Sequence, residues 1–171
     1  MVIRDVYPGE LAEIGELRLA AYRTDGFLTP ESSYALRLRE LGSDGLGVVL
    51  VAVESDSGPP LGTVMLQSWP HAGKMVQGPG EGEIRALAVR HEARGAGVGR
   101  ALLAAVIDRA AREGIRHLLL STQPDMKAAQ HLYEKAGFIR LPERDWAPEP
   151  GDPLLAFGMQ IGAGQAGRLA R

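Results

Sequence analysis

The sequence predicts an α/β fold, and three observations lead to it. Apolar stretches of strand length alternate along most of the chain with stretches that carry apolar residues at 3.6-residue spacing. A glycine-rich turn at 94–100 joins one such strand, 83–89, to the helix that follows. The length of 171 residues fits one domain with its own core, which we expect to cover 1–161. The glycine- and alanine-rich end, 162–171, is expected to be frayed.

The first part of the chain predicts three strands and two helices. Residues Val2–Tyr7 alternate as a strand, and Glu10–Arg23 places apolar residues on one helical face. A second helix is predicted to begin at Pro30, because proline fits the first turn of a helix, and to end before Gly42. Two strands, at 47–54 and 61–67, follow on either side of a D-S-G-P-P turn and should pair as a hairpin.

The segment Trp69–Gly80 is rich in glycine and proline and contains His71 and Lys74. It could be a mobile lid over an acceptor site or a plain solvated connection, and its composition favours the connection.

The second part of the chain predicts four strands and two helices. The helix after the glycine turn is amphipathic and should end at Gly114. The remaining elements are predicted at 115–122 (strand), 125–136 (helix), 138–141 (strand) and 154–161 (strand).

Composition excludes several classes of protein. The net charge is −2 and no basic stripe is present, which argues against a protein that binds nucleic acid or a membrane surface. The absence of cysteine excludes disulfides, thiolate metal sites and a cysteine nucleophile. The histidines are scattered, so no metal site is expected. No signal peptide or membrane span is predicted, and we expect a cytoplasmic protein.

The glycine turn is a candidate anion site. Gly95, Gly97 and Gly99 free the backbone so that N–H groups can turn toward one ligand, and the helix that follows presents its positive end there. A phosphate or pyrophosphate is therefore the expected ligand. A P-loop would need Lys and Ser/Thr where Arg100 and Ala101 stand, and the glycine spacing does not fit a dinucleotide fingerprint either.

Two motifs carry a resemblance to a known family. Arg94, Gly97 and Gly99 form R-x-x-G-x-G, and residues 129–138 form A-x-x-x-Y-x-x-x-G-F. Together they resemble the two signatures of the GCN5-related N-acetyltransferase (GNAT) superfamily. The segments S-T-Q-P-x-M at 121–126 and P-E-R-D-W at 142–146 are similar to those of a bacterial subgroup.

The resemblance implies a fold and a cofactor. The fold would be a mixed, twisted sheet of about seven strands, splayed between the fourth and fifth, with helices on both faces. Acetyl-CoA would be the co-substrate, its pyrophosphate on the glycine turn and its pantetheine along the central strand. The residues implied in this binding are Leu87, Ala88, Val89, Arg94, Gly95, Ala96, Gly97, Val98, Gly99, Arg100, Gln123 and Ala129. A homodimer is plausible for the superfamily.

The resemblance also implies catalytic residues. Glu83 stands where family members often take the proton from the amine, and Tyr133 matches the tyrosine that protonates the departing sulfur. Period-two geometry places Glu81 and Arg85 on the face of Glu83. Repulsion from Glu81 could raise one carboxyl pKa, whereas Arg85 could instead make an ordinary surface ion pair with Glu83. Glu83, Glu81 and water therefore all remain candidate bases.

The acceptor is not encoded in any pattern that we recognise. The amine acceptor would be a small molecule or a peptide, and Tyr22, Phe27, Tyr34 and Glu81 are candidates for binding it. Many relatives carry Asn where this chain has Met126, so the grip on pantetheine would have to come from Gln123, from backbone groups or from water. A non-catalytic CoA-binding module is the alternative function, and a hydroxyl acceptor is less favoured.

Overall fold

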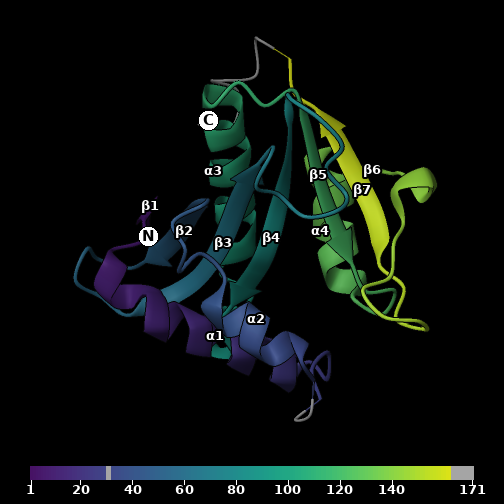
Figure 1. Ribbon diagram of the computed structural model, residues 1–171. Coiled ribbons are helices and arrows are strands. Elements are labelled where there is room, and N and C mark those ends of the chain that lie inside the picture. The colour runs from purple at the N-terminus through teal and green to yellow at the C-terminus, as the bar shows by residue number, and fades with distance from the viewer. Residues whose placement is uncertain (30–31, 163–171) are drawn as a thin grey trace. The chain divides into compact units, whose positions relative to one another are not determined.

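The computed structural model describes residues 1–29 and 32–162, so the predicted frayed end beyond residue 162 lies outside the described residues. Seven strands hydrogen-bond into a mixed sheet in the order β1-β2-β3-β4-β5-β7-β6, which confirms the predicted fold class (Figure 1). The strands are β1 Val2–Asp5, β2 Val48–Val53, β3 Pro60–Ser68, β4 Glu81–Val89, β5 His117–Thr122, β6 Ile139–Arg140 and β7 Leu155–Gln160. The α-helices are α1 Leu11–Thr24, α2 Tyr34–Glu40, α3 Val98–Arg112 and α4 Lys127–Ala136. Short 3-10 turns occur at Pro8–Glu10, His91–Ala93 and Pro142–Arg144.

The chain folds into two compact units, of which the first comprises Met1–Met65 and Ala86–Val106. Its core forms where Ile14 of α1 packs on Met65 of β3 and on the valines of β2. The opposite face of β3 belongs to α3, because a Cβ at Gly62 would lie 3.0 Å from Leu102 and 3.1 Å from Val98. Helices therefore cover both faces of the strands in this unit, as expected.

Helix α2 begins later than the sequence predicts. Its first helical residue is Tyr34 and its N-cap is Ser33, whereas the prediction placed the start at Pro30. Ser33 makes no side-chain capping hydrogen bond; the Tyr34 N–H at the helix start instead donates to Ser32 Oγ at 3.2 Å. Residues 30 and 31 lie outside the described part of the chain. The helix buries Leu38 in a cluster with Leu19 of α1 and Ala86 of β4.

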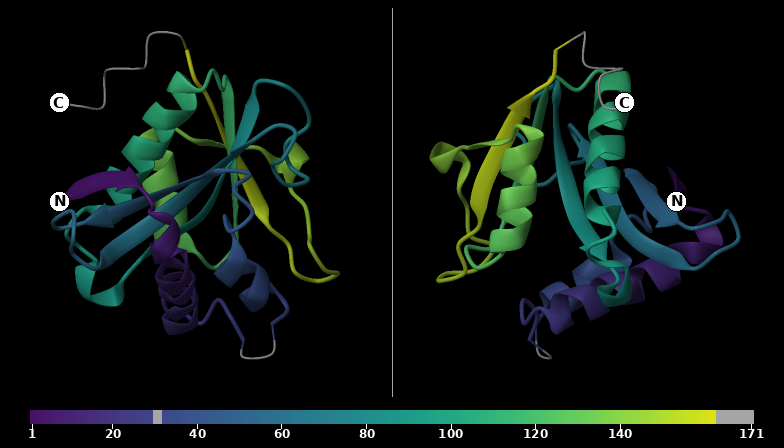
Figure 2. Two further views of the ribbon diagram at one scale, coloured as in Figure 1. Left: turned by 60° about the vertical axis from the view of Figure 1, so that its left-hand side comes forward. Right: turned by 180° about the vertical axis from the view of Figure 1, so that it is seen from behind.

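The second unit comprises residues 66–85 and the chain from 107 onward. Strand β5 lies between β4 and β7, pairing with β7 antiparallel along its full length, and β6 pairs with the outer side of β7. Helix α4 runs along one face of β5 and β7 and comes to the front when the molecule is seen from behind (Figure 2). It ends at Gly137, whose φ of 103° requires the left-handed conformation that glycine adopts at a helix C-terminus.

The parallel pairing of β4 with β5 is short. It joins Glu81–Glu83 to His117–Leu119, the first three residues of each strand, in agreement with the expected splay. Further along β4, Ala86 has a φ of 52°, a left-handed conformation that costs a non-glycine residue roughly 1–2 kcal/mol. Alanine gives no sequence signal for such a bend, so it was not predicted.

Candidate functional site

The glycine turn at the start of α3 is the candidate anion site. Gly95 and Gly97 have φ values of 79° and 81°, which side-chain-bearing residues rarely adopt. The N–H of Ala101 donates to the Gly97 carbonyl at 3.0 Å, so the N–H groups of residues 98–100 precede the first helical hydrogen bond. A Cβ at Gly95 would meet no atom within 4 Å. The residues of this turn therefore fit a pyrophosphate at the positive end of a helix.

Arg94 is held by an acidic partner within the same unit. Its Nη1 and Nη2 atoms donate to the two carboxylate oxygens of Asp25, just after α1, at 2.6 and 2.9 Å. The implied contact of Arg94 with pyrophosphate remains a prediction, and it would compete with this ion pair. The backbone N–H groups of residues 98–100 would bind an anion without such competition.

Glu83 is a buried carboxylate that accepts a hydrogen bond from a backbone N–H group. Glu83 is only 4% exposed, and its Oε2 atom accepts a hydrogen bond from the Gly73 N–H at 2.9 Å. Burial raises the pKa of the Glu83 carboxyl, while the charge of Arg85 and the Gly73 N–H offset part of that rise. A carboxyl with a raised pKa is better matched to proton abstraction near neutral pH than an exposed one.

The raised pKa of Glu83 does not come from Glu81, so the predicted repulsion is wrong as its cause. Glu81 accepts hydrogen bonds from Arg144 and from the Gln77 N–H, and lies 3.2 Å from His117. The Arg144 guanidinium lowers the pKa of Glu81 to about 2, which makes it a poor base.

The alternative of a surface ion pair between Arg85 and Glu83 does not describe this structure either. Glu83 is buried, and Arg85 donates to Gln67 Oε1 at 2.9 Å. Arg85 acts on Glu83 through its charge, which lowers the carboxyl pKa against the larger effect of burial.

The 69–80 segment is an anchored loop, so the interpretation as a plain solvated connection is wrong. Met75 and Val76 are 3% and 7% exposed and pack on Leu119 of β5 and Ala156 of β7. The Met75 carbonyl accepts a hydrogen bond from Arg144 at 2.7 Å. Tertiary contacts therefore fix this loop, and its composition alone did not reveal them.

Tyr133 lies on α4 and is 7% exposed. Its ring meets Phe138 edge to face, with centroids 6.1 Å apart. Burial raises the pKa of the Tyr133 phenol to about 12, so the hydroxyl keeps its proton throughout the ordinary assay range. Ala129 lies one turn earlier on the same helix.

The other predicted site residues have the following places. Leu87, Ala88 and Val89 end β4, and their contact with pantetheine stays a prediction. Tyr22 and Tyr34 are half-buried against the cluster of Leu19, Leu28, Leu38 and Ala86, and Phe27 follows α1. At the start of α4 the carbonyl of Gln123 accepts from the side-chain amide of Gln130 at 3.0 Å, and Met126 is the N-cap.

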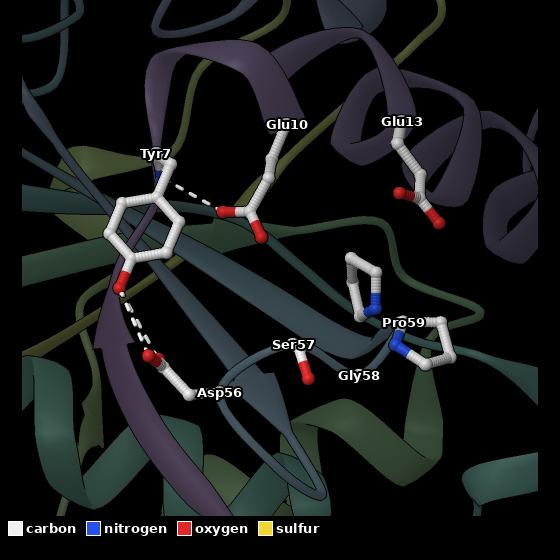
Figure 3. A pocket seen from close by; sticks show the side chains of 8 residues that line it. Tyr7, Glu10, Glu13, Asp56, Ser57, Gly58 and Pro59 are labelled. Atoms are coloured by element: carbon white, nitrogen blue, oxygen red, sulfur yellow. Dashed lines mark hydrogen bonds between the residues drawn. The ribbon is translucent and has the colours of Figure 1, made fainter.

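A hollow of the first unit contains none of these residues. It has a volume of about 830 Å³ and is lined by Tyr7, Glu10, Glu13, Asp56, Ser57, Gly58, Pro59 and Pro60 (Figure 3). Its carboxylates are already paired: Glu10 with Arg4, Glu13 with Arg90, and Asp56 with Arg4 and the Tyr7 hydroxyl. The chemistry of the side chains, rather than the size of this hollow, therefore makes Glu83 and the glycine turn the candidate functional residues.

Sequence reasoning missed two residues of the second unit that hold Glu83 and its loop. Gly73 donates to the carboxylate, and Arg144 binds the loop carbonyl. Arg144 stands in the P-E-R-D-W segment, so a signal was present without a role attached to it. Within residues 1–29 and 32–162, no cluster of His, Asp and Glu could hold a metal ion, and no helix is long and apolar enough to cross a membrane.

Comparisons with known proteins agree on the family. The family model described as "Acetyltransferase (GNAT) family" matches residues 11–138. A mycothiol acetyltransferase of Kocuria rhizophila is 38% identical over 97 residues, covering 57% of this chain and 31% of that protein. N-alpha-acetyltransferase 30 of Saccharomyces cerevisiae is 34% identical over 94 residues, covering 53% of this chain and 51% of that protein. The aligned parts thus span from about a third to half of the length of these relatives.

Solved structures show the same fold. A GNAT acetyltransferase from Staphylococcus aureus superposes with a TM-score of 0.74 at 16% identity, over 94% of this chain and 99% of that one. A Salmonella typhimurium structure solved with its cofactor acetyl-CoA gives 0.65 at 22% identity, over 95% and 94% of the two chains. With a family model that matches most of its length and a fold shared with these structures, this chain belongs to the acetyltransferase (GNAT) family.

Proposed function

We propose that this chain is an acetyl-CoA-dependent N-acetyltransferase in which Glu83 is the general base and Tyr133 the general acid. The observation that carries the proposal is the buried Glu83 carboxylate, with its raised pKa and the N–H donor from Gly73. Family membership supports the acetyl transfer, and the name of the yeast relative supports a nitrogen acceptor.

The acceptor must lose a proton before it can attack. An alkyl ammonium has a pKa near ~10.4, so roughly one molecule in a few thousand is neutral at pH 7. Glu83 Oε2, or a water molecule that it binds, would take that proton. The burial that raises the carboxyl pKa brings it nearer to the working pH, which is what an efficient base requires.

The donor side needs a grip and a proton. The N–H groups of residues 98–100 would hold the pyrophosphate, and acetyl-CoA, when bound, supplies an activated thioester carbonyl. The Tyr133 hydroxyl would donate to the departing sulfur. Because burial raises the pKa of Tyr133 to about 12, donation through a hydrogen bond is easier than complete transfer of the proton.

The test compares turnover with binding. Thiol release from acetyl-CoA is measured over a panel of amines and peptide N-termini, and the thermal shift with CoA is measured beside it. We expect turnover with at least one amine, and a loss of roughly 10²-fold in the Glu83→Gln variant with CoA binding retained. Glu134→Gln, an exposed carboxylate on α4, is the control and should behave like the parent.

Stability gives a second readout for the same variant. A carboxyl with a pKa raised by burial stabilises the fold fully below its unfolded pKa and loses that contribution as the pH rises through its folded pKa. Glu83→Gln should therefore melt at or above the parent temperature at pH 8, with the difference fading toward pH 4. CoA binding without turnover by any amine would instead indicate a non-catalytic CoA-binding module.

A further inference from the structure

The P-E-R-D-W segment is fixed firmly to the strands of the second unit. Asp145 accepts two hydrogen bonds from Arg140, both at 2.6 Å, and one from the Ala156 N–H at 2.8 Å. The indole N–H of Trp146 donates to Ser121 Oγ at 3.4 Å. These contacts join Asp145 and Trp146, which follow Arg144 directly in the chain, to β5, β6 and β7.

From the P-E-R-D-W segment, Arg144 reaches the 69–80 loop. Its Nη1 atom donates to the Met75 carbonyl at 2.7 Å, and its two terminal nitrogens donate to Glu81 at 3.1 and 2.7 Å. Glu81 Oε2 in turn accepts the Gln77 N–H at 2.7 Å. Arg144 and Glu81 therefore hold the loop on both sides of Val76.

The clamped stretch leads directly to Gly73. The Val76 N–H donates to the Gly73 carbonyl at 3.1 Å, which closes a turn between the clamp and the donor to Glu83. A Cβ at position 73 would lie 2.7 Å from Glu83 Oε2, so the loop backbone approaches the carboxylate as closely as a glycine permits. Movement of the clamp would therefore change the Gly73 hydrogen bond.

We infer that Arg144 is a positioning residue for Glu83, acting through Glu81 and the Met75 carbonyl to hold the Gly73 N–H against the carboxylate. The inference rests on the proposed function, in which Glu83 is the base. It gives the P-E-R-D-W segment a role in catalysis, which is separate from its part in the fold and from the binding of acetyl-CoA.

The electrostatics predict in which direction the pKa of Glu83 changes when Arg144 is removed. Among the charged and titratable groups on the elements that pack against Glu83, Arg85 acts on its carboxyl directly. Glu81 stands two positions earlier on β4 and contacts His117 and Arg144, and His71 and Lys74 flank Gly73 in the chain. Arg85 and the Gly73 N–H both lower the pKa of Glu83. If Arg144 is removed, the Gly73 hydrogen bond is weakened, and this change raises the pKa of Glu83.

The test uses Arg144→Gln and Arg144→Lys, with Arg140→Gln as a matched control. Arg140 on β6 also makes a two-pronged ion pair, but its partners are Asp145 of the P-E-R-D-W segment and the Ala156 carbonyl. We expect the acidic limb of the pH–rate profile to move up by about one pH unit in Arg144→Gln, and by less in Arg144→Lys, which keeps one charge. Arg140→Gln removes one contact of the segment but leaves those of Asp145 with the Ala156 N–H and of Trp146 with Ser121, so it should lower the melting temperature without moving the limb.

A second measurement separates this inference from the proposed function. The Glu83 carboxyl is titrated by ¹³C NMR in the absence of substrate, its signal assigned by comparison with Glu83→Gln, and it should show the same upward shift in Arg144→Gln. An unshifted titration in Arg144→Gln, or an equal shift in Arg140→Gln, would overturn the inference. A parent protein that turns over no amine would overturn the proposed function, while the NMR titration would still decide the role of Arg144.

Discussion

A single methyl group at Gly73 tests how far the environment of Glu83 controls catalysis. In Gly73→Ala the new Cβ would lie 2.7 Å from Glu83 Oε2, well inside van der Waals contact, so the carboxylate must move away. The move lengthens or breaks the 2.9 Å hydrogen bond from the Gly73 N–H. Glu83 is 4% exposed, so water cannot readily replace the lost N–H donor.

The size of the effect follows from that hydrogen bond. A hydrogen bond to a charged group contributes about 1.5–3 kcal/mol, and one pKa unit corresponds to about 1.4 kcal/mol. Loss of the bond disfavours the ionised form, so the pKa of Glu83 should rise by roughly 1–2 units above its already raised value. A base works only when it is unprotonated, so on the acidic limb the rate should fall roughly 10- to 100-fold and recover at higher pH.

The assay is the pH dependence of kcat/KM for thiol release, with Gly78→Ala as the control. Gly78 lies in the same loop, and a Cβ there would meet nothing within 4 Å, so its profile should match that of the parent. A Gly73→Ala enzyme with the acidic limb of the parent would show that the N–H does not set the basicity of Glu83. A rate loss equal at every pH would point to a displaced substrate.

Three further predictions concern the donor site, the acid and the clamp. Gly97→Glu should abolish the thermal shift with CoA, because it adds a charge and a side chain at a φ of 81° where pyrophosphate is expected. A thermal shift equal to that of the parent would show that the pyrophosphate binds elsewhere. Tyr133→Phe should lower kcat by roughly 10²-fold with little change in KM or melting temperature, whereas a lower melting temperature with normal turnover would make Tyr133 a packing residue. Glu81, with its pKa lowered to about 2, stabilises the fold above its unfolded pKa of 4.5. The free energy of unfolding of the parent should therefore fall by up to about 3 kcal/mol as the pH is lowered from 4.5 to 2. Glu81→Gln should not show that fall.

Local chemistry in the sequence determined much of the fold. The strand and helix periods predicted all seven strands and four helices to within a few residues, because burying one face requires a regular spacing of apolar side chains. The glycines at 95 and 97 predicted the turn, since their positive φ values are a backbone property that few other residues supply. The two motifs identified the family that the comparisons confirm.

The environment of Glu83 was decided by tertiary structure. Its charge neighbours along the strand, Glu81 and Arg85, suggested repulsion or a surface ion pair, but burial governs its pKa and Arg144 removes Glu81 as a base. Gly73 and Arg144 stand 10 and 61 positions from Glu83 in the chain, counting 83 − 73 and 144 − 83. A pKa depends on burial, charge and hydrogen bonds within a few ångströms, and chain folding brings these groups together without leaving a periodic signal in the sequence.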